Sequence, residues 1–212
     1  SYALYRLTQR HLQRLLLPLG EAADKDEVRA GARRLELPSA DVADSQDLCF
    51  MAGSDYRTLV AELRPESRKP GPIYNKEGRR LGEHEGLSAY TVGQRSGLNI
   101  PSSERLYVLE LDAARNALTV GSRSDLARTR CTLRYLTFIA GAPPASTFRA
   151  EGRIRYRAPL TSVRVTTHEE DRAIVDFDEP QYGVAPGQSL VLYDGERVLG
   201  GGVIVSDREP SR

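Results

Sequence analysis

The sequence predicts an α+β protein that is mostly β, with a short helical N-terminal segment, a small β-rich central domain and a C-terminal antiparallel β-barrel. Helical apolar spacing and helix caps are confined to roughly the first 65 residues. A proline-rich stretch follows, and beyond it short β-branched and aromatic runs alternate with turns. The expected division is 1–66, 67–127 and 128–206, with a tail at 207–212.

Three helices are expected in the N-terminal segment. Thr8 can cap a helix that continues to Leu17, and Asp24 with Glu27 resembles the capping box of a second helix. Ser54 can cap a third, short helix.

The central part begins with a linker and continues with two hairpins. Residues 64–72 contain three prolines and read as the linker. The run 75–78, Asn-Lys-Glu-Gly, is typical of a hairpin turn, and 107–111 with 117–120 form a second hairpin.

Six strands are expected in the last third, and Asp194-Gly195 is typical of a tight hairpin turn between the final two. This spacing is typical of a small barrel or sandwich. The strands are 131–138, 148–156, 161–166, 173–177, 189–193 and 198–205.

The distribution of charge and the lack of long apolar runs limit which kinds of partner and cellular location are expected. The formal net charge of the 212 residues is only +1, but nine arginines lie between Arg123 and Arg164 against two carboxylates. Such a local excess fits either a nucleic-acid contact or a solvated arginine-rich surface. Two distant cysteines and the lack of a long apolar run or signal-like N-terminus favour a cytoplasmic protein outside the membrane.

Motifs for phosphate and metal binding are missing from the sequence. It contains neither G-x-x-x-x-G-K-[ST] nor C-x-x-C. We expect surface or turn roles for His11, His84 and His168, and no metal site.

Cys49 ends the polar run DSQDLCF at residues 44–50, between two expected helices. A reactive sulfur must be a reachable thiolate, and a polar loop offers that setting. Packing beside Leu48 and Phe50 is the competing interpretation. Cys131 instead opens an alternating strand, and we expect it to face the barrel interior.

Arginines alternate with apolar residues in the run Arg153-Ile154-Arg155-Tyr156-Arg157. On a strand, the three arginines would share one face and repel one another unless an anion such as a phosphate lay there. Salt bridges to Asp176 or Asp178 on a neighbouring strand are the alternative.

Two glycine-containing runs accompany the last strands. The Pro186-Gly187-Gln188 run predicts a turn that presents an amide side chain. The three glycines 200–202 predict a bulge or a barrel corner.

Five motifs in order resemble the bacterial-type tRNA-specific 2-thiouridylases. The motifs are SY followed by LTQ at the N-terminus, DSQDLCF, LGEHEGLSAYTVGQRSGL, RIRYR and APGQSLVLYDGERVLGGGVI. The resemblance implies an ATP-dependent enzyme that makes 2-thiouridine at the wobble position of tRNA. It also implies a nucleotide-binding α/β domain upstream of a central domain and a β-barrel.

The resemblance also assigns roles to residues. Cys49 matches the cysteine that carries sulfur as a persulfide and later forms a disulfide. Arg155, Tyr156 and Gln188 match tRNA contacts, and Arg153 and Arg157 are further candidates. ATP would bind the missing upstream part, so we expect this chain alone to be inactive. The implied partners are tRNA and a persulfide sulfur-donor protein.

Two functions of another class remain open. The chain could be a stand-alone RNA-binding barrel without catalysis, or a barrel that docks protein partners.

Overall fold

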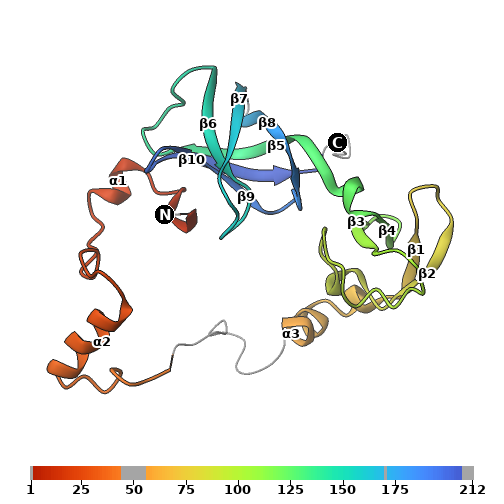
Figure 1. Ribbon diagram of the computed structural model, residues 1–212, viewed down its shortest axis with the longest axis horizontal. Helices are drawn as coiled ribbons and strands as arrows, with labels where there is room; N and C mark the ends of the chain where they lie inside the picture. The colour runs from red at the N-terminus through yellow and green to blue at the C-terminus, as the bar shows by residue number, and fades with distance from the viewer. Residues whose placement is uncertain (1, 44–55, 170, 207–212) are drawn as a thin grey trace.

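The computed structural model describes residues 2–43, 56–169 and 171–206. Within them the predicted α+β, mostly β class is confirmed: short helices precede a four-stranded sheet and a closed six-stranded barrel (Figure 1). No helix among these residues is both long and apolar enough to cross a bilayer.

The N-terminal segment forms less helix than predicted. After the 3₁₀ helix η1 (Tyr2–Leu4), α1 (Gln9–Leu12) follows Thr8 as expected but ends five residues before Leu17. Every side chain from residue 13 to residue 20 is exposed. A short helix is marginal without tertiary packing, so this leucine-rich run does not continue α1.

The second helix matches its prediction and the third does so in part. In α2 (Lys25–Arg34), the Asp24 carboxylate accepts a hydrogen bond from the Glu27 N–H (2.9 Å). The Glu27 carboxylate accepts one from the N–H of Ala23, rather than from that of Asp24 (2.8 Å). The third helix is α3 (Tyr56–Leu63), and its expected cap, Ser54, lies outside the described residues.

The central sheet has the strand order β2-β1-β4-β3. It pairs the two predicted hairpins through parallel contacts between β1 and β4. Its buried core combines Ile73, Val108, Leu118 and Val120. The strands are β1 (Gly71–Tyr74), β2 (Arg80–His84), β3 (Tyr107–Asp112) and β4 (Ala117–Gly121).

The predicted linker 64–72 is shorter than expected. Residues Pro65–Arg68 form the 3₁₀ helix η3, and β1 already begins at Gly71. A Cβ atom at Gly71 would collide with the Asn116 carbonyl, so only glycine fits there.

His84 does not have the surface or turn role predicted for it. The side chain lies at the end of β2 and is 1% exposed. Its Nδ1 accepts a hydrogen bond from the Gly86 N–H (3.1 Å), and its Nε2 lies 3.1 Å from the Asn116 carbonyl oxygen. An imidazole protonated at Nε2 satisfies both contacts, so His84 ties β2 to the β3–β4 turn.

The C-terminal part is a closed barrel with the strand order β10-β5-β8-β7-β6-β9. Cys131 faces the interior as predicted and is 3% exposed, among Leu133, Val175, Leu190 and Ile204. The strands are β5 (Ala127–Phe138), β6 (Thr147–Arg153), β7 (Thr161–His168), β8 (Arg172–Tyr182), β9 (Ser189–Asp194) and β10 (Arg197–Val205).

The glycines 200–202 interrupt β10 as predicted. The pairing register shifts between Val198 and Gly200 on the β9 side, and between Gly201 and Val203 on the β5 side. Gly200 has φ +154, and a Cβ there would collide with the Thr137 carbonyl. The bulged run therefore needs residues without side chains.

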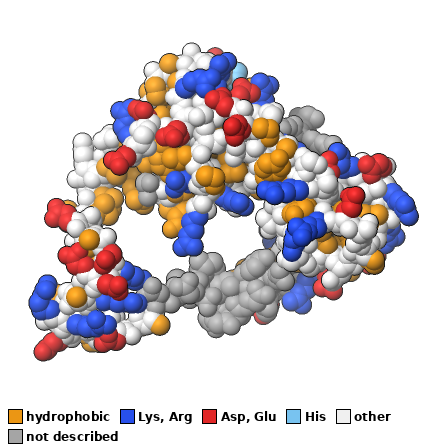
Figure 2. Space-filling view, viewed as in Figure 1, with side chains coloured by type: hydrophobic (Ala, Val, Ile, Leu, Met, Phe, Trp, Pro, Cys, Tyr) orange, Lys and Arg blue, Asp and Glu red, His pale blue; other side chains and the backbone are white. Residues whose placement is uncertain are grey.

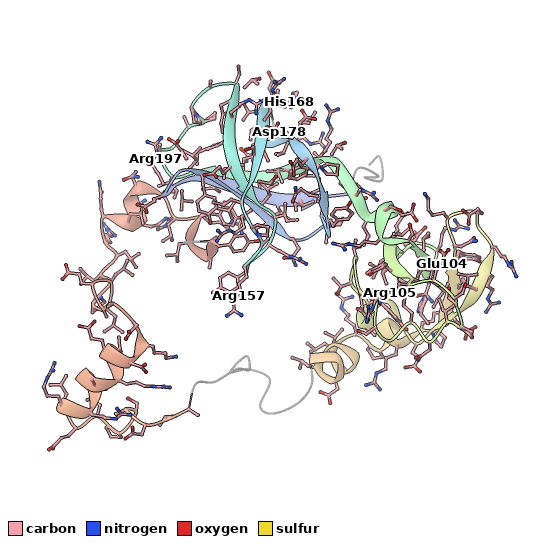
Figure 3. All side chains as sticks on the ribbon, in the orientation of Figure 1. Glu104, Arg105, Arg157, His168, Asp178 and Arg197 are labelled. Atoms are coloured by element: carbon pink, nitrogen blue, oxygen red, sulfur yellow. The ribbon has the colours of Figure 1, made fainter. Side chains whose placement is uncertain are left out.

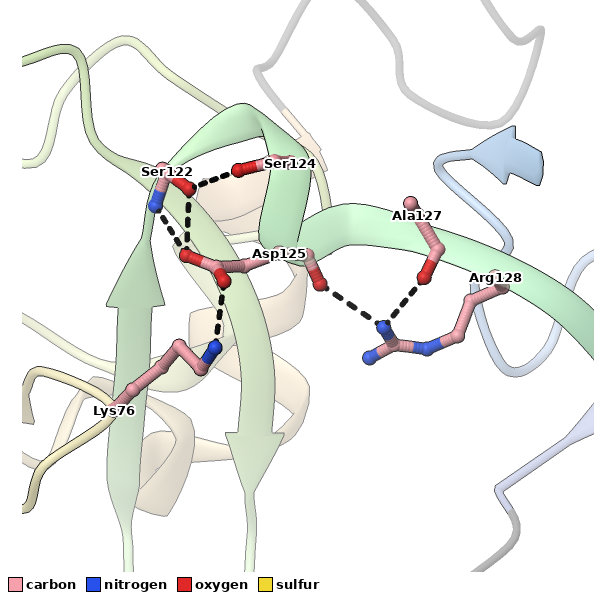
Figure 4. Close-up of polar contacts among 6 residues, drawn as sticks. All are labelled: Lys76, Ser122, Ser124, Asp125, Ala127 and Arg128. Carbon is pink, nitrogen blue, oxygen red and sulfur yellow. Dashed lines mark hydrogen bonds and ion pairs between the residues drawn. The ribbon is translucent and has the colours of Figure 1, made fainter.

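A short 3₁₀ helix, η5 (Arg123–Leu126), joins β4 to β5 and is held by Asp125 (Figure 4). The Asp125 carboxylate accepts hydrogen bonds from the Ser122 N–H (2.8 Å) and hydroxyl (2.7 Å). It also pairs with Lys76 from the β1–β2 turn (2.6 Å). The hydrogen bonds from Lys76 and then from Ser122 lower the Asp125 pKa from 3.8 to about 2.

We predict that Asp125→Asn destabilises the chain at pH 7, because it removes the charge that pairs with Lys76. The loss should be only about 1 kcal/mol, since Lys76 is partly solvated and water screens the pair. The lowered pKa stabilises the folded state above pH 4, and this stabilisation is lost as the pH falls from about 4 to about 2. Urea unfolding at several pH values should therefore show a flatter acid profile for the variant.

The control for this experiment is Glu83→Gln, which breaks the exposed pair with Arg80 (2.7 Å). We expect it to change stability by only a few tenths of a kcal/mol. Identical acid profiles for Asp125→Asn and the wild type would show that the Lys76 pair does not hold η5.

Candidate nucleic-acid interface

The arginine-rich run forms a turn and not the predicted strand. β6 ends at Arg153, three residues before the expected end at Tyr156, and residues 154–158 form what we call the RY turn. The Ala158 N–H donates to the Arg155 carbonyl (3.1 Å), and Arg157 has φ +65. The three arginines therefore do not share a strand face, and the predicted strand conformation of residues 154–156 is wrong.

The side chains of the RY turn have different surroundings. Ile154 is buried in the barrel core, whereas Arg155, Tyr156 and Arg157 are exposed, Tyr156 by 66%. The Arg157 guanidinium lies 5.3 Å from the centre of the Tyr156 ring. Figure 3 shows Arg157 pointing away from the barrel, and Figure 2 shows Lys and Arg side chains along the same side.

Arg153 is set apart from the exposed arginines. Its guanidinium lies 5.5 Å from the centre of the Tyr193 ring. Its Nε is buried and has no hydrogen-bond partner among the described residues. This half-buried position makes Arg153 less accessible to a ligand than Arg155.

The alternative of salt bridges to Asp176 or Asp178 is wrong for the RY turn. Asp176 pairs with Arg130 (2.5 Å) and Asp178 with Arg149 (2.7 Å). Within the described part of the chain, neither Arg155 nor Arg157 makes an ion pair. Their charges remain available to an external anion.

Gln188 lies in the predicted turn before β9. Gly187 adopts φ +86, its N–H donates to the Ile204 carbonyl (2.8 Å), and the Ile204 N–H donates to the Gln188 carbonyl (2.8 Å). These bonds fix the backbone of what we call the PGQ loop, residues 183–188, to β10. The Gln188 side chain is exposed.

The RY turn, the PGQ loop and the central segment 82–98, which contains Gly93, meet at Gly183. A Cβ placed on Gly183 would lie 3.6 Å from Arg155 Nη1, and one placed on Gly93 would lie 3.8 Å from the Gly183 Cα. Segments about 30 and 90 residues away in the chain thus approach one loop. Sequence reasoning could not place these segments together, because no local pattern encodes the contact.

A cavity of about 610 Å³ opens beside the PGQ loop, between the central sheet and the barrel. Its size is in the range of small-molecule sites, and arginine, glutamine and tyrosine side chains supply polar walls. Sequence reasoning missed Arg128 and Arg130 as lining residues, because they entered only as part of the arginine excess. Polar and aromatic lining residues include Tyr90, Thr91, Arg128, Arg130 and Gln188.

Of the two cysteines, Cys131 lies within the residues that the structure describes and Cys49 does not. Cys131 belongs to the buried barrel core and is 3% exposed, and it also lines the cavity beside the PGQ loop.

Comparisons with known proteins cover nearly the whole chain. Residues 1–53 match the tRNA methyl transferase HUP domain, and 58–122 the tRNA methyl transferase PRC-barrel domain. Residues 128–204 match the aminomethyltransferase beta-barrel domain. The chain is 47% identical to the tRNA-specific 2-thiouridylase MnmA of Roseiflexus castenholzii over 207 residues, which are 98% of this chain and 56% of the relative.

The chain belongs to the tRNA-specific 2-thiouridylase family. Two further MnmA proteins give the same result. That of Chloroflexus aggregans is 46% identical over 96% of this chain and 56% of its own length. The MnmA of Moorella thermoacetica is 44% identical over 97% of this chain and 57% of its own length. The chain therefore spans a little more than half the length of these 2-thiouridylases.

Proposed function

We propose that this chain is the tRNA-binding and sulfur-carrying part of a tRNA-uridine 2-sulfurtransferase that makes 2-thiouridine at the wobble position. The observation that carries the proposal is the similarity over 96–98% of the chain to proteins named tRNA-specific 2-thiouridylases. The family match to residues 128–204 spans the RY turn and the PGQ loop, the surface to which we assign tRNA binding.

The RY turn has the chemistry that a nucleic-acid contact requires. Arg155 and Arg157 offer planar donors that fit phosphate oxygens, and no carboxylate among the described residues neutralises them. Tyr156 offers an exposed ring on which a base can stack. We therefore assign phosphate contacts to Arg155 and Arg157 and a stacking contact to Tyr156.

Gln188 supplies a neutral contact beside these charges. Its amide can both donate and accept hydrogen bonds, and the PGQ loop holds its backbone against β10. A neutral hydrogen bond contributes less than a charged one, so Gln188 adds to the arginine contacts rather than replacing them.

Cys49 is the proposed sulfur carrier. The Cys49 thiolate would attack the outer sulfur of a persulfide on a donor protein, so that a new S–S bond forms on Cys49, the donor's S–S bond breaks and the donor's thiolate is released. ATP is the expected cofactor of the complete protein. The residues of this chain do not fit it, since the sequence has no glycine-rich phosphate loop, and we derive no step through ATP.

The N-terminal segment presents unpartnered apolar side chains. Leu16, Leu17, Leu19 and Leu35 are 64–85% exposed. Exposed leucines gathered in the stretch between α1 and α2 and at the end of α2 are typical of a surface that another part covers. We assign that role to the remainder of the nucleotide-binding domain in the complete protein.

We predict that Arg155→Ala weakens tRNA binding and lowers the log–log salt slope by about 0.7–0.9, because one phosphate contact is lost. Filter binding of tRNA to the chain at several salt concentrations measures both quantities. Arg197→Ala is the matched control, since Arg197 is exposed at the start of β10 and pairs with Asp194 (2.8 Å). Unchanged affinity and slope for Arg155→Ala would remove the RY turn from the tRNA site.

We predict that Cys49→Ser abolishes thiolation by the complete protein, because a hydroxyl cannot hold a sulfane sulfur. Cys131→Ser should keep activity per folded molecule while lowering stability, because it buries a hydroxyl in the core. The measurement is 2-thiouridine content of tRNA together with a thermal melt. A folded Cys131→Ser protein as inactive as Cys49→Ser would reverse the assignment of the two cysteines.

A further inference from the structure

Two tyrosines near the N-terminus bind the barrel next to Gln188. The Tyr2 hydroxyl donates to the Ser189 carbonyl (2.7 Å), and the Tyr5 hydroxyl lies 3.0 Å from the Ser189 hydroxyl. Burial, followed by the neighbouring hydroxyls of Tyr5 and Tyr193, raises the pKa of Tyr2 above its usual value. Both hydrogen bonds end on the residue that directly follows Gln188. We call Tyr2 and Tyr5 the tyrosine clamp.

The rings of the tyrosine clamp fix its position on the barrel. Tyr5 is 4% exposed and packs with Val191 and Tyr193. A Cβ placed on Gly201 would lie 3.0 Å from the Tyr5 ring, so the ring lies directly on the glycine run of β10. Figure 1 shows the N-terminus beside β9 and β10.

The clamp also reaches the RY turn. The Tyr2 ring centre lies 6.2 Å from that of Tyr156, with the rings inclined at 50°. Tyr193, which packs against Tyr5, is in turn contacted by the guanidinium of Arg153, the last residue of β6 before the RY turn. Tyr2 therefore contacts Tyr156, a proposed tRNA contact, and both tyrosines contact Ser189 beside Gln188, although these partners lie about 150 to 190 residues away in the chain.

Binding at an exposed turn requires that its side chains be ordered. Tyr156 is 66% exposed, and immobilising such a side chain on binding costs conformational entropy. A ring that already packs against Tyr156 reduces that cost, because fewer rotamers remain to be lost. The hydrogen bonds to Ser189 likewise hold the first residue of β9, to which the PGQ loop is joined.

We propose that Tyr2 and Tyr5 are positioning residues that pre-order the RY turn and the PGQ loop for tRNA. This inference rests on the proposed function. Positioning by Tyr2 and Tyr5 makes the tRNA affinity of the barrel depend on a segment at the opposite end of the chain. The barrel then binds tRNA best when the N-terminal segment is packed against it.

The test measures tRNA affinity of the 212-residue chain by filter binding, with a tRNA transcript as the probe. Tyr2→Ala should weaken binding about three- to tenfold, the fold-change that corresponds to the ordering cost of one side chain. Tyr2→Phe keeps the ring and loses the hydroxyl, so its loss should be smaller. Tyr135→Ala is the matched control, because Tyr135 is 60% exposed on β5, and it should bind like the wild type.

A double-mutant cycle separates positioning from simple attachment of the N-terminus. If Tyr2 acts through Tyr156, the effect of Tyr2→Ala should fall below about twofold in a Tyr156→Ala background. Tyr5→Phe, which retains the buried ring, tests the Ser189 hydroxyl contact without emptying the core. The positioning role would be overturned if the fold-losses of tRNA affinity caused by Tyr2→Ala and by Tyr156→Ala simply multiplied in the double variant.

The controls also distinguish this inference from the proposed function. Weaker binding by Arg155→Ala together with wild-type affinity for Tyr2→Ala and Tyr5→Phe would overturn the tyrosine clamp alone. Wild-type affinity for the Arg155→Ala variant as well would overturn the barrel site, and the clamp with it.

Discussion

Closure of the barrel depends on how closely β10 approaches β5 and β9, and three consecutive glycines permit that approach. A Cβ on Gly200 would collide with the Thr137 carbonyl, and one on Gly202 would lie 2.9 Å from the Arg134 carbonyl oxygen. In the same run, the missing side chain at Gly201 lets the Tyr5 ring approach the backbone of β10 closely. The glycines that allow the barrel to close therefore also allow the N-terminal segment to pack on it, beside the PGQ loop.

Features with short-range causes could be predicted from the sequence. The Asp194-Gly195 turn, the Asp24 cap and the 75–78 hairpin turn each follow from the chemistry of adjacent residues. Predictions that needed distant partners were less successful. The leucines after Leu12 find no packing partner among the described residues, so the helix stops. His84 is buried because Asn116 and Gly86 satisfy its ring, and no pattern around His84 indicates this.

The candidate site shows the same division. Alternation in residues 153–157 predicted a strand, but burial of Ile154 and the left-handed conformation of Arg157 produce a turn. Arg155, Tyr156 and Gln188 were named through the family resemblance, not from local pattern. The contacts of Tyr2 and Tyr5 with Ser189 and Tyr156 were not predictable, because they join the two ends of the chain.

The central claim is that tRNA binds where the RY turn and the PGQ loop meet, and hydrogen exchange measured by mass spectrometry with and without tRNA tests it most directly. Slower exchange in residues 154–158 and 183–188 is expected, with the loop 139–146 between β5 and β6 unchanged. Slower exchange confined to 139–146 or to the central sheet, with residues 154–158 and 183–188 unaffected, would contradict the claim.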